Sequence, residues 1–89
     1  MLDVRYGGTF KKDFKLCKKR GYNLKLLQDV IDLLRVPSDL PEKNRDHLLT
    51  GNYKNWRECH VAPDWLLIYR YEENTLLLSR TGTHSDLFT

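Results

Sequence analysis

Apolar residues recur along this chain with two different spacings. Near the N-terminus and again in the second half, short segments either alternate between apolar and polar positions or are almost wholly apolar. Both patterns are typical of strands, the first buried on one face and the second on both. Between these regions apolar residues recur every three or four positions, which places them on one face of a helix. The pattern therefore predicts a strand, then two helices, then a group of strands.

The first predicted helix begins at Phe10 and ends before Gly21. Phe10, Phe14 and Cys17 lie four and three positions apart, so they share one helical face, while lysines occupy the other faces. Thr9 is a suitable N-cap. Gly21 is suited to follow the last turn because glycine adopts left-handed backbone angles without strain.

A second helix is expected after Asn23, whose side chain can cap its first turn. Pro37 should end it, because a residue before proline is displaced from helical backbone angles. Residues 37–51, with two prolines and a glycine, are expected to form a loop. The apolar positions at helical spacing in this helix are Leu24, Leu27, Val30, Ile31 and Leu34.

Four segments are predicted to be strands, at residues 2–6, 53–61, 65–71 and 75–81. Residues 85–88 are expected to form a final helical turn. The resulting order, β-α-α-β-β-β, is typical of an α+β fold in which two helices pack on a small, mainly antiparallel sheet of three or four strands. We expect all 89 residues to form one such domain.

Length and composition narrow the function classes. A chain of 89 residues builds one core but no deep, walled site, which favours a large extended substrate over a small metabolite. No apolar run approaches the roughly 18 residues of a membrane span, and the polar start does not resemble a secretory signal. We therefore expect a bacterial cytoplasmic protein with no membrane partner. The two cysteines, Cys17 and Cys59, are too few for a disulfide framework and are expected in the core.

Charge is distributed unevenly along the chain. The net charge is +3, but residues 1–25 hold eight basic residues against two acidic ones, a net +6, which leaves −3 for the rest. Such a block is typical of a surface that meets a phosphate backbone, although a solvated helix face looks the same in sequence. The residues of this block predicted to contact a nucleic acid are Lys11, Lys12, Lys15, Lys18, Lys19 and Arg20.

The candidate chemistry lies in the second half of the chain. His47, His60 and His84 fall in loops or at ends of predicted strands, and so do Asp64 and Arg80. In an antiparallel sheet such positions can meet on one rim. Cleavage of RNA without a metal needs a base for the ribose 2′-OH, an acid for the leaving 5′-oxygen and a cation for the phosphate, and these side chains supply all three.

Two alternatives remain open at this stage. A zinc site could be built from the three histidines, Cys59 and Asp64. However, Cys59 and His60 are adjacent on a predicted strand and so point to opposite faces, and no paired ligand spacing is present. The aromatic residues Trp56, Trp65 and Phe88 can stack on bases, but Trp65 adjoins an apolar strand and fits a core position equally well.

Three segments carry a family resemblance. Residues 46–51 (DHLLTG), 56–69 (WRECHVAPDWLLIY) and 80–88 (RTGTHSDLF) resemble, in order and spacing, the motifs of RelE-superfamily toxins of the YafQ type. With the basic first helix and the similar length, the resemblance covers essentially the whole chain.

The resemblance implies a RelE-like fold and a ribosome-dependent endoribonuclease that cuts messenger RNA in the decoding site of the 70S ribosome. It implies a cognate antitoxin as partner, contact with operator DNA only through that complex, and no metal or organic cofactor. The family's functional positions carry over to His47, His60, Asp64, Arg80, His84 and Phe88, with Trp65 as a weaker RNA-binding transfer.

By this analogy His84 and Asp64 transfer protons, in an order that the sequence does not define. His47 and His60 would orient or stabilise the scissile phosphate, which Arg80 would bind, while Phe88 would position a base or fix the C-terminal end. Two other functions fit the same features. One is a non-catalytic module that binds the antitoxin and helps it repress DNA, and the other is a ribonuclease that acts on free RNA.

Overall fold

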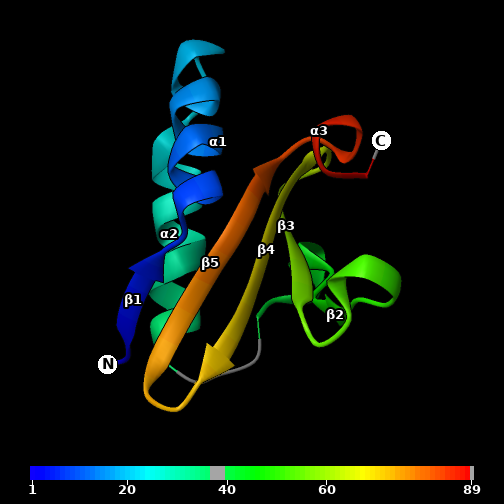
Figure 1. Ribbon diagram of the computed structural model, residues 1–89. Coiled ribbons are helices and arrows are strands. Elements are labelled where there is room, and N and C mark those ends of the chain that lie inside the picture. The colour runs from blue at the N-terminus through cyan, green and yellow to red at the C-terminus, as the bar shows by residue number, and fades with distance from the viewer. Residues whose placement is uncertain (37–39, 89) are drawn as a thin grey trace.

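A computed structural model, described here for residues 1–36 and 40–88, has two helices on one side of a curled five-stranded sheet (Figure 1). The α+β prediction is confirmed, with one to two more strands than expected. The elements in chain order are β1 (Asp3–Tyr6), α1 (Gly8–Lys19), α2 (Leu24–Arg35), the 3₁₀ turn η1 (Glu42–Asn44), β2 (His47–Leu48), the 3₁₀ turn η2 (Gly51–Tyr53), β3 (Arg57–Ala62), β4 (Trp65–Glu72), β5 (Thr75–Gly82) and α3 (His84–Phe88).

Both helices form where the spacing of apolar residues predicted them, but the residue predicted to cap the first helix was wrong. Gly7, not Thr9, precedes α1, and no side chain caps that helix. Gly21 follows α1 with a φ of 77°, as predicted, and the Asn23 side chain accepts a 3.1 Å hydrogen bond from the backbone N–H of Lys25 at the start of α2. The last residue of α2 is Arg35, whereas Pro37 lies outside the described residues.

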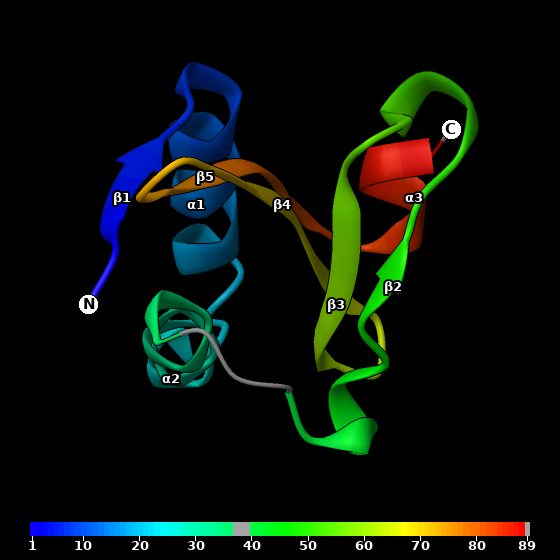
Figure 2. The ribbon, with the colours of Figure 1, turned by 90° about the horizontal axis from the view of Figure 1, so that it is seen from below.

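The sheet has the order β1-β5-β4-β3-β2, and it is mixed rather than purely antiparallel. β1 pairs in parallel with the first half of β5, while β5, β4, β3 and β2 pair antiparallel in succession. β5 therefore lies between the first strand of the chain and β4. Figure 2 shows β1 and β3 on opposite sides of the β4–β5 pair.

The segment between α2 and β3 is more structured than predicted. The expected loop at residues 37–51 contains η1 and β2, and the strand expected from residue 53 begins at Arg57. The reason is local. Gly51 and Asn55 have φ angles of 70° and 74°, so the chain turns twice through left-handed conformations there and cannot stay extended.

The sheet has a core on each face. Under α1 and α2 lies the larger one, which includes Leu27, Ile31, Leu67 and Leu76. Both cysteines are buried in it, as expected. On the opposite, open face, Leu66, Ile68 and Leu87 form a smaller cluster beneath α3 and η2. No helix among the described residues is long and apolar enough to cross a membrane.

Candidate active site

The predicted site residues gather at one end of the open face, and the strand register explains why. His60 on β3 pairs with Leu66 on β4, which pairs with Gly82 on β5. Because paired residues project to the same side of a sheet, His60 lies on the face of Leu66, opposite α1 and α2. β5 ends at Gly82, and α3 begins two residues later with His84, so the chain places the two histidines at the same end.

His84 is held by Asp64, which lies in the turn between β3 and β4. The carboxylate Oδ1 accepts a hydrogen bond from the His84 backbone N–H at 3.0 Å and lies 2.7 Å from Nδ1 of the ring. These two contacts, the backbone one first, lower the pKa of Asp64 below its usual value. Asp64 is therefore ionised near neutral pH, Nδ1 carries the shared proton, and Nε2 of His84 is left for chemistry.

The other two histidines meet a buried carboxylate. Glu58 on β3 has a side chain that is only 5% exposed, and its Oε1 lies 3.5 Å from Nε2 of His60 and 3.6 Å from Nε2 of His47. The His60 and His84 rings are 5.8 Å apart between centroids. The structure thus brings His47, His60, His84 and Asp64 together, with Glu58 at the centre.

Phe88 lies beside this group on the last turn of α3. Its ring centroid is 6.3 Å from that of His84 and 5.6 Å from that of Tyr53, in an edge-to-face arrangement with the tyrosine. The Tyr53 hydroxyl donates to the Leu87 carbonyl at 3.4 Å. The turn η2 therefore covers α3 from the outside and holds Phe88 next to the histidines.

Arg80 on β5 pairs with Ile68 on β4, which in turn pairs with Glu58 on β3. It is paired with Asp13 of α1, whose carboxylate accepts from Nε at 2.6 Å and from Nη2 at 3.2 Å. Asp13 also accepts from the backbone N–H of Thr81 at 3.2 Å. β1 pairs only with the first half of β5, so the Thr81 N–H has no partner from that strand, and Asp13 accepts its hydrogen bond instead. The pair raises the pKa of Arg80 and leaves its guanidinium half-buried.

Arg20 has a structural partner that the sequence did not indicate. It donates to both carboxylate oxygens of Asp86 on α3, at 2.7 and 3.1 Å. Asp86 also accepts from the Thr83 backbone N–H, and Thr83 Oγ1 accepts in return from the Asp86 N–H, a reciprocal cap of α3. Gly82 leaves room for this carboxylate, since a Cβ there would lie 2.8 Å from Asp86 Oδ2.

The burial of Trp65 argues against the RNA contact predicted for it. Trp65 is only 4% exposed, its indole N–H donates to Thr81 Oγ1 at 2.9 Å, and its ring lies 4.9 Å from that of Tyr22. A side chain packed in this way cannot stack on a base. The lysines predicted to contact RNA, at positions 11, 12, 15, 18 and 19, are all exposed on α1. They lie on the helix side of the sheet, away from the histidines.

Sequence reasoning missed Glu58, although a signal was present. Glu58 and His60 are two positions apart on a predicted strand and must therefore share a face. Ligand atoms of Glu58, His60 and His84 all lie within 4.8 Å of one another. Two imidazoles and a carboxylate are a donor set that suits a copper or zinc ion, so these residues fit a transition metal. Cys59, considered earlier as a ligand, points to the opposite face and is fully buried.

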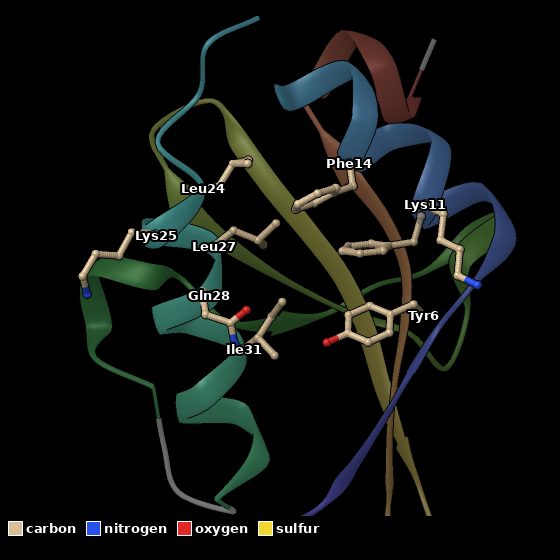
Figure 3. A pocket seen from close by; sticks show the side chains of 9 residues that line it. Tyr6, Lys11, Phe14, Leu24, Lys25, Leu27, Gln28 and Ile31 are labelled. Atoms are coloured by element: carbon tan, nitrogen blue, oxygen red, sulfur yellow. The ribbon is translucent and has the colours of Figure 1, made fainter. Parts of the chain in front are cut away.

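A second feature lies on the helix side. An apolar groove of about 570 Å³ opens between β1, α1 and α2, and Figure 3 shows Tyr6, Phe14, Leu27 and Ile31 directed into it. Lys11 and Lys25 lie at the margins of this groove. The sheet separates this groove from the histidines, so a molecule could occupy one without contacting the other.

Comparison with known proteins adds to these observations. Residues 2–89 match the family model described as bacterial toxin of type II toxin–antitoxin system, YafQ. The chain is 41% identical over 87 residues to the Escherichia coli K12 mRNA interferase toxin YafQ, an alignment that covers 97% of this chain and 95% of the relative.

Solved structures agree with the fold throughout its length. The E. coli DinJ–YafQ toxin–antitoxin complex contains a chain that superposes with a TM-score of 0.90 at 40% identity, covering 99% of this chain and 98% of that one. A metal-bound toxin from Helicobacter pylori superposes with a TM-score of 0.92 at 44% identity, covering 99% and 100%.

Proposed function

The chain belongs to the YafQ family of bacterial toxins from type II toxin–antitoxin systems, and we propose that it is an endoribonuclease that cuts messenger RNA in the A site of the ribosome. The observation that carries this proposal is the cluster of His60, His84 and Asp64. The centroids of its two imidazole rings are 5.8 Å apart, a distance that a ribose and its phosphate can span. The carboxylate of Asp64 fixes the orientation of the His84 ring.

His84 is the proposed general acid. Asp64 fixes its Nδ1, as an ionised carboxylate orients the imidazole of a hydrolase triad, and Nε2 then donates a proton to the leaving 5′-oxygen. The low pKa of Asp64 makes this carboxylate a weak base, which favours an orienting role over direct proton transfer. Asp64, which the family resemblance made a proton-transfer residue, thus becomes the residue that orients His84, and the second proton transfer passes to His60.

His60 is the proposed general base, with Glu58 as its partner. It takes the proton of the ribose 2′-OH, whose oxygen forms a bond to phosphorus as the bond from phosphorus to the 5′-oxygen breaks. The products are a 2′,3′-cyclic phosphate and a free 5′-hydroxyl. His47, on the other side of Glu58, and Arg80 would stabilise charge on the phosphate, and Phe88 would position a base.

Glu58, His60 and His84 are the residues that would hold a transition-metal ion. Bound there, such an ion acts as a Lewis acid. The proposed cleavage does not require it, because these ring nitrogens transfer the protons themselves and could not do so while they coordinate a metal.

We further propose that a cognate antitoxin silences the protein, as the DinJ–YafQ complex of the relative suggests, and that the protein acts in the bacterial cytoplasm, where ribosomes and messenger RNA are found. An operator would be contacted only through the antitoxin complex. The exposed lysines of α1 would contact ribosomal RNA, and such a contact should weaken steeply as salt rises.

The deciding experiment adds purified protein to bacterial ribosomes programmed with a defined messenger, with a ribosome-free control, and maps new RNA ends. We expect cuts only on ribosomes, at a fixed place in the codon, with 2′,3′-cyclic or 3′-phosphate ends. Cuts in naked RNA would instead indicate a ribonuclease of free RNA. A folded protein that makes no cuts would be the non-catalytic module.

His84→Gln tests the assigned acid. The side chain is about half exposed, so its replacement should leave the fold intact, while loss of the acid should lower kcat/KM about 10²–10⁴-fold. The matched control is Glu73→Gln in the β4–β5 turn, which should cut at the wild-type rate. An H84Q protein that cuts normally would remove His84 from the mechanism.

A further inference from the structure

A second hollow lies at the other end of the open face. It has a volume of about 330 Å³ and is formed by β1, the first residues of α1, the turn before β3, and strands β4 and β5. The side chains that matter here are Arg5, Trp56, Arg70 and Glu72. None of them was assigned a role in the cleavage chemistry.

Trp56 and Arg70 form the wall of this hollow. The guanidinium carbon of Arg70 lies over the Trp56 ring, 4.5 Å from its centroid. The ring is half-buried and packs against the Leu66–Ile68 cluster, which fixes its position. The Arg70 side chain is 37% exposed, so part of the guanidinium remains free to meet a ligand. Tryptophan and arginine planes are the groups on which proteins stack unpaired bases.

The charge of the hollow is positive. Arg5 and Arg70 contribute two cations, and Glu72 one anion, which accepts a 3.1 Å hydrogen bond from Nη2 of Arg70. Glu72 is more than half exposed, so it can move away when a phosphate approaches. The first turn of α1, which closes the hollow, carries no acidic side chain.

The hollow and the histidines share one surface. Leu66, Ile68 and Arg70 alternate along β4 and project to the same side, and Leu66 is the partner of His60. Arg70 is four residues from Leu66, which on a strand is about 13 Å. Leu66 and Ile68 are buried beneath α3 and η2, so a single strand of RNA that crosses this cover can contact both places, with different nucleotides at each.

We propose that Trp56, Arg70 and Arg5 form a binding subsite for one nucleotide of single-stranded RNA, beside the nucleotide that is cut. The base lies against the Trp56–Arg70 pair, and the two arginines bind phosphate. This inference rests on the proposed ribonuclease function, because it assigns the hollow to the same RNA. An antitoxin segment is the less favoured occupant, since the apolar groove on the opposite side offers it a larger surface.

Binding is measured with a short single-stranded RNA whose riboses are all 2′-O-methylated, so that it cannot be cut. Tryptophan emission should fall as the RNA binds, because a base stacks near Trp56, whereas Trp65 is buried and remains as background. Trp56→Phe keeps an aromatic ring in place and should remove the quench. Absence of any quench in the wild type, with intact binding, would overturn the stacking contact.

The arginines are tested by Arg70→Gln and Arg5→Gln. Each should weaken RNA binding about five-fold or more and reduce the slope of log K against log salt by about 0.7, the change for one phosphate contact on a single strand. Lys25→Gln, which removes a charge on the helix side, is the matched control and should bind as the wild type does. Arg5 is exposed on an edge strand, so R5Q decides the matter if R70Q does not fold.

The same variants on programmed ribosomes separate the two proposals. If the wild type cuts and R70Q and R5Q cut with unchanged kcat/KM, the subsite is wrong and the ribonuclease stands. If the wild type does not cut but the methylated RNA still quenches Trp56, the ribonuclease proposal fails and the RNA subsite stands. If R70Q loses affinity for the antitoxin and not for RNA, the hollow belongs to the antitoxin.

Discussion

The two tryptophans of the chain serve different purposes, and their surroundings show which is which. Trp65 begins β4, contacts Tyr22 through its ring and Thr81 through its indole N–H, and is almost fully buried. Trp56 is half-buried and faces a hollow that also contains Arg70. A residue type that suits base stacking is therefore informative only together with its burial.

Trp65→Phe should lower the free energy of unfolding and leave cleavage unchanged. The substitution removes the hydrogen bond to Thr81 in a buried site, which costs about 1–3 kcal/mol. Urea denaturation measures the loss, and the ribosome assay measures kcat/KM. The control is Trp56→Phe, which should lower the free energy of unfolding less than W65F does but should weaken RNA binding. A W65F protein of normal stability that no longer cuts would restore Trp65 to the RNA-binding set.

At the site, residue types were predictable but partners were not. The spacing placed His60, His84 and Asp64 near strand ends, and the register of the sheet brings them together. The pairs Arg80–Asp13 and Arg20–Asp86 join residues 67 and 66 positions apart, at a separation where sequence spacing carries no information. Charge balance along the chain could not indicate which carboxylate meets which guanidinium.

At the scale of elements, α3 depends on others for its position. It has five residues, too few to be stable alone, yet it carries His84 and Phe88. Arg20 at the end of α1 anchors it through Asp86, and η2 covers it through Tyr53. The basic first helix thus contributes to the site through one arginine that orders α3, in addition to any contact of its lysines with RNA.

Asp86→Asn should destabilise the protein by about 1 kcal/mol at neutral pH, as expected for a cap together with a partly screened ion pair. Arg20 holds the pKa of Asp86 well below its usual range, so the pair stabilises the fold above the unfolded-state pKa of about 4. That stability is lost as the pH falls through the lower, folded-state pKa. The difference between D86N and wild type should therefore shrink progressively below pH of about 4.

Urea unfolding at a series of pH values checks this expectation. Asp29→Asn, which removes an exposed i, i+4 partner of Lys25 on α2, is the control and should change stability by less than about 0.5 kcal/mol. D86N should also cut more slowly, because α3 carries the proposed acid. A pH-independent difference would show that the charge of Asp86 is not what anchors α3.

The sequence predicted elements well where their stabilisation is local. Helical spacing identified α1 and α2, and the Asn23 cap and Gly21 were both correct because each acts within a few residues. The start of β3 was placed too early, because the spacing of apolar residues does not reveal the left-handed turns at Gly51 and Asn55. The parallel pairing of β1 with β5 depends on contacts between the two ends of the chain, which no local pattern reveals.

At the scale of the whole molecule, the sheet divides two surfaces of different chemistry. The open face carries the histidines and the Trp56–Arg70 hollow, whereas the helix face carries the exposed lysines of α1 and the apolar groove that Figure 3 shows. An apolar groove with lysines at its margins suits a partner segment that combines apolar and acidic residues. The cognate antitoxin is the partner that we expect there.

Lys25→Glu should weaken antitoxin binding about ten-fold or more while leaving cleavage intact, because it places a like charge against an acidic segment at the groove margin. Titration calorimetry with the purified antitoxin measures the affinity. Glu73→Lys, a charge reversal in the β4–β5 turn, is the control and should bind normally. If K25E binds the antitoxin as the wild type does, the groove is not the contact surface.

The central position of β5 has a consequence for how the protein is made. Synthesis proceeds from the N-terminus, so β1 emerges before β5 and lacks its strand partner until residues 75–78 follow. α3, which carries His84 and Phe88, comes after β5 along the chain and emerges later still. A growing chain therefore holds neither the β1–β5 pair nor an assembled site until β5 and α3 have both been made.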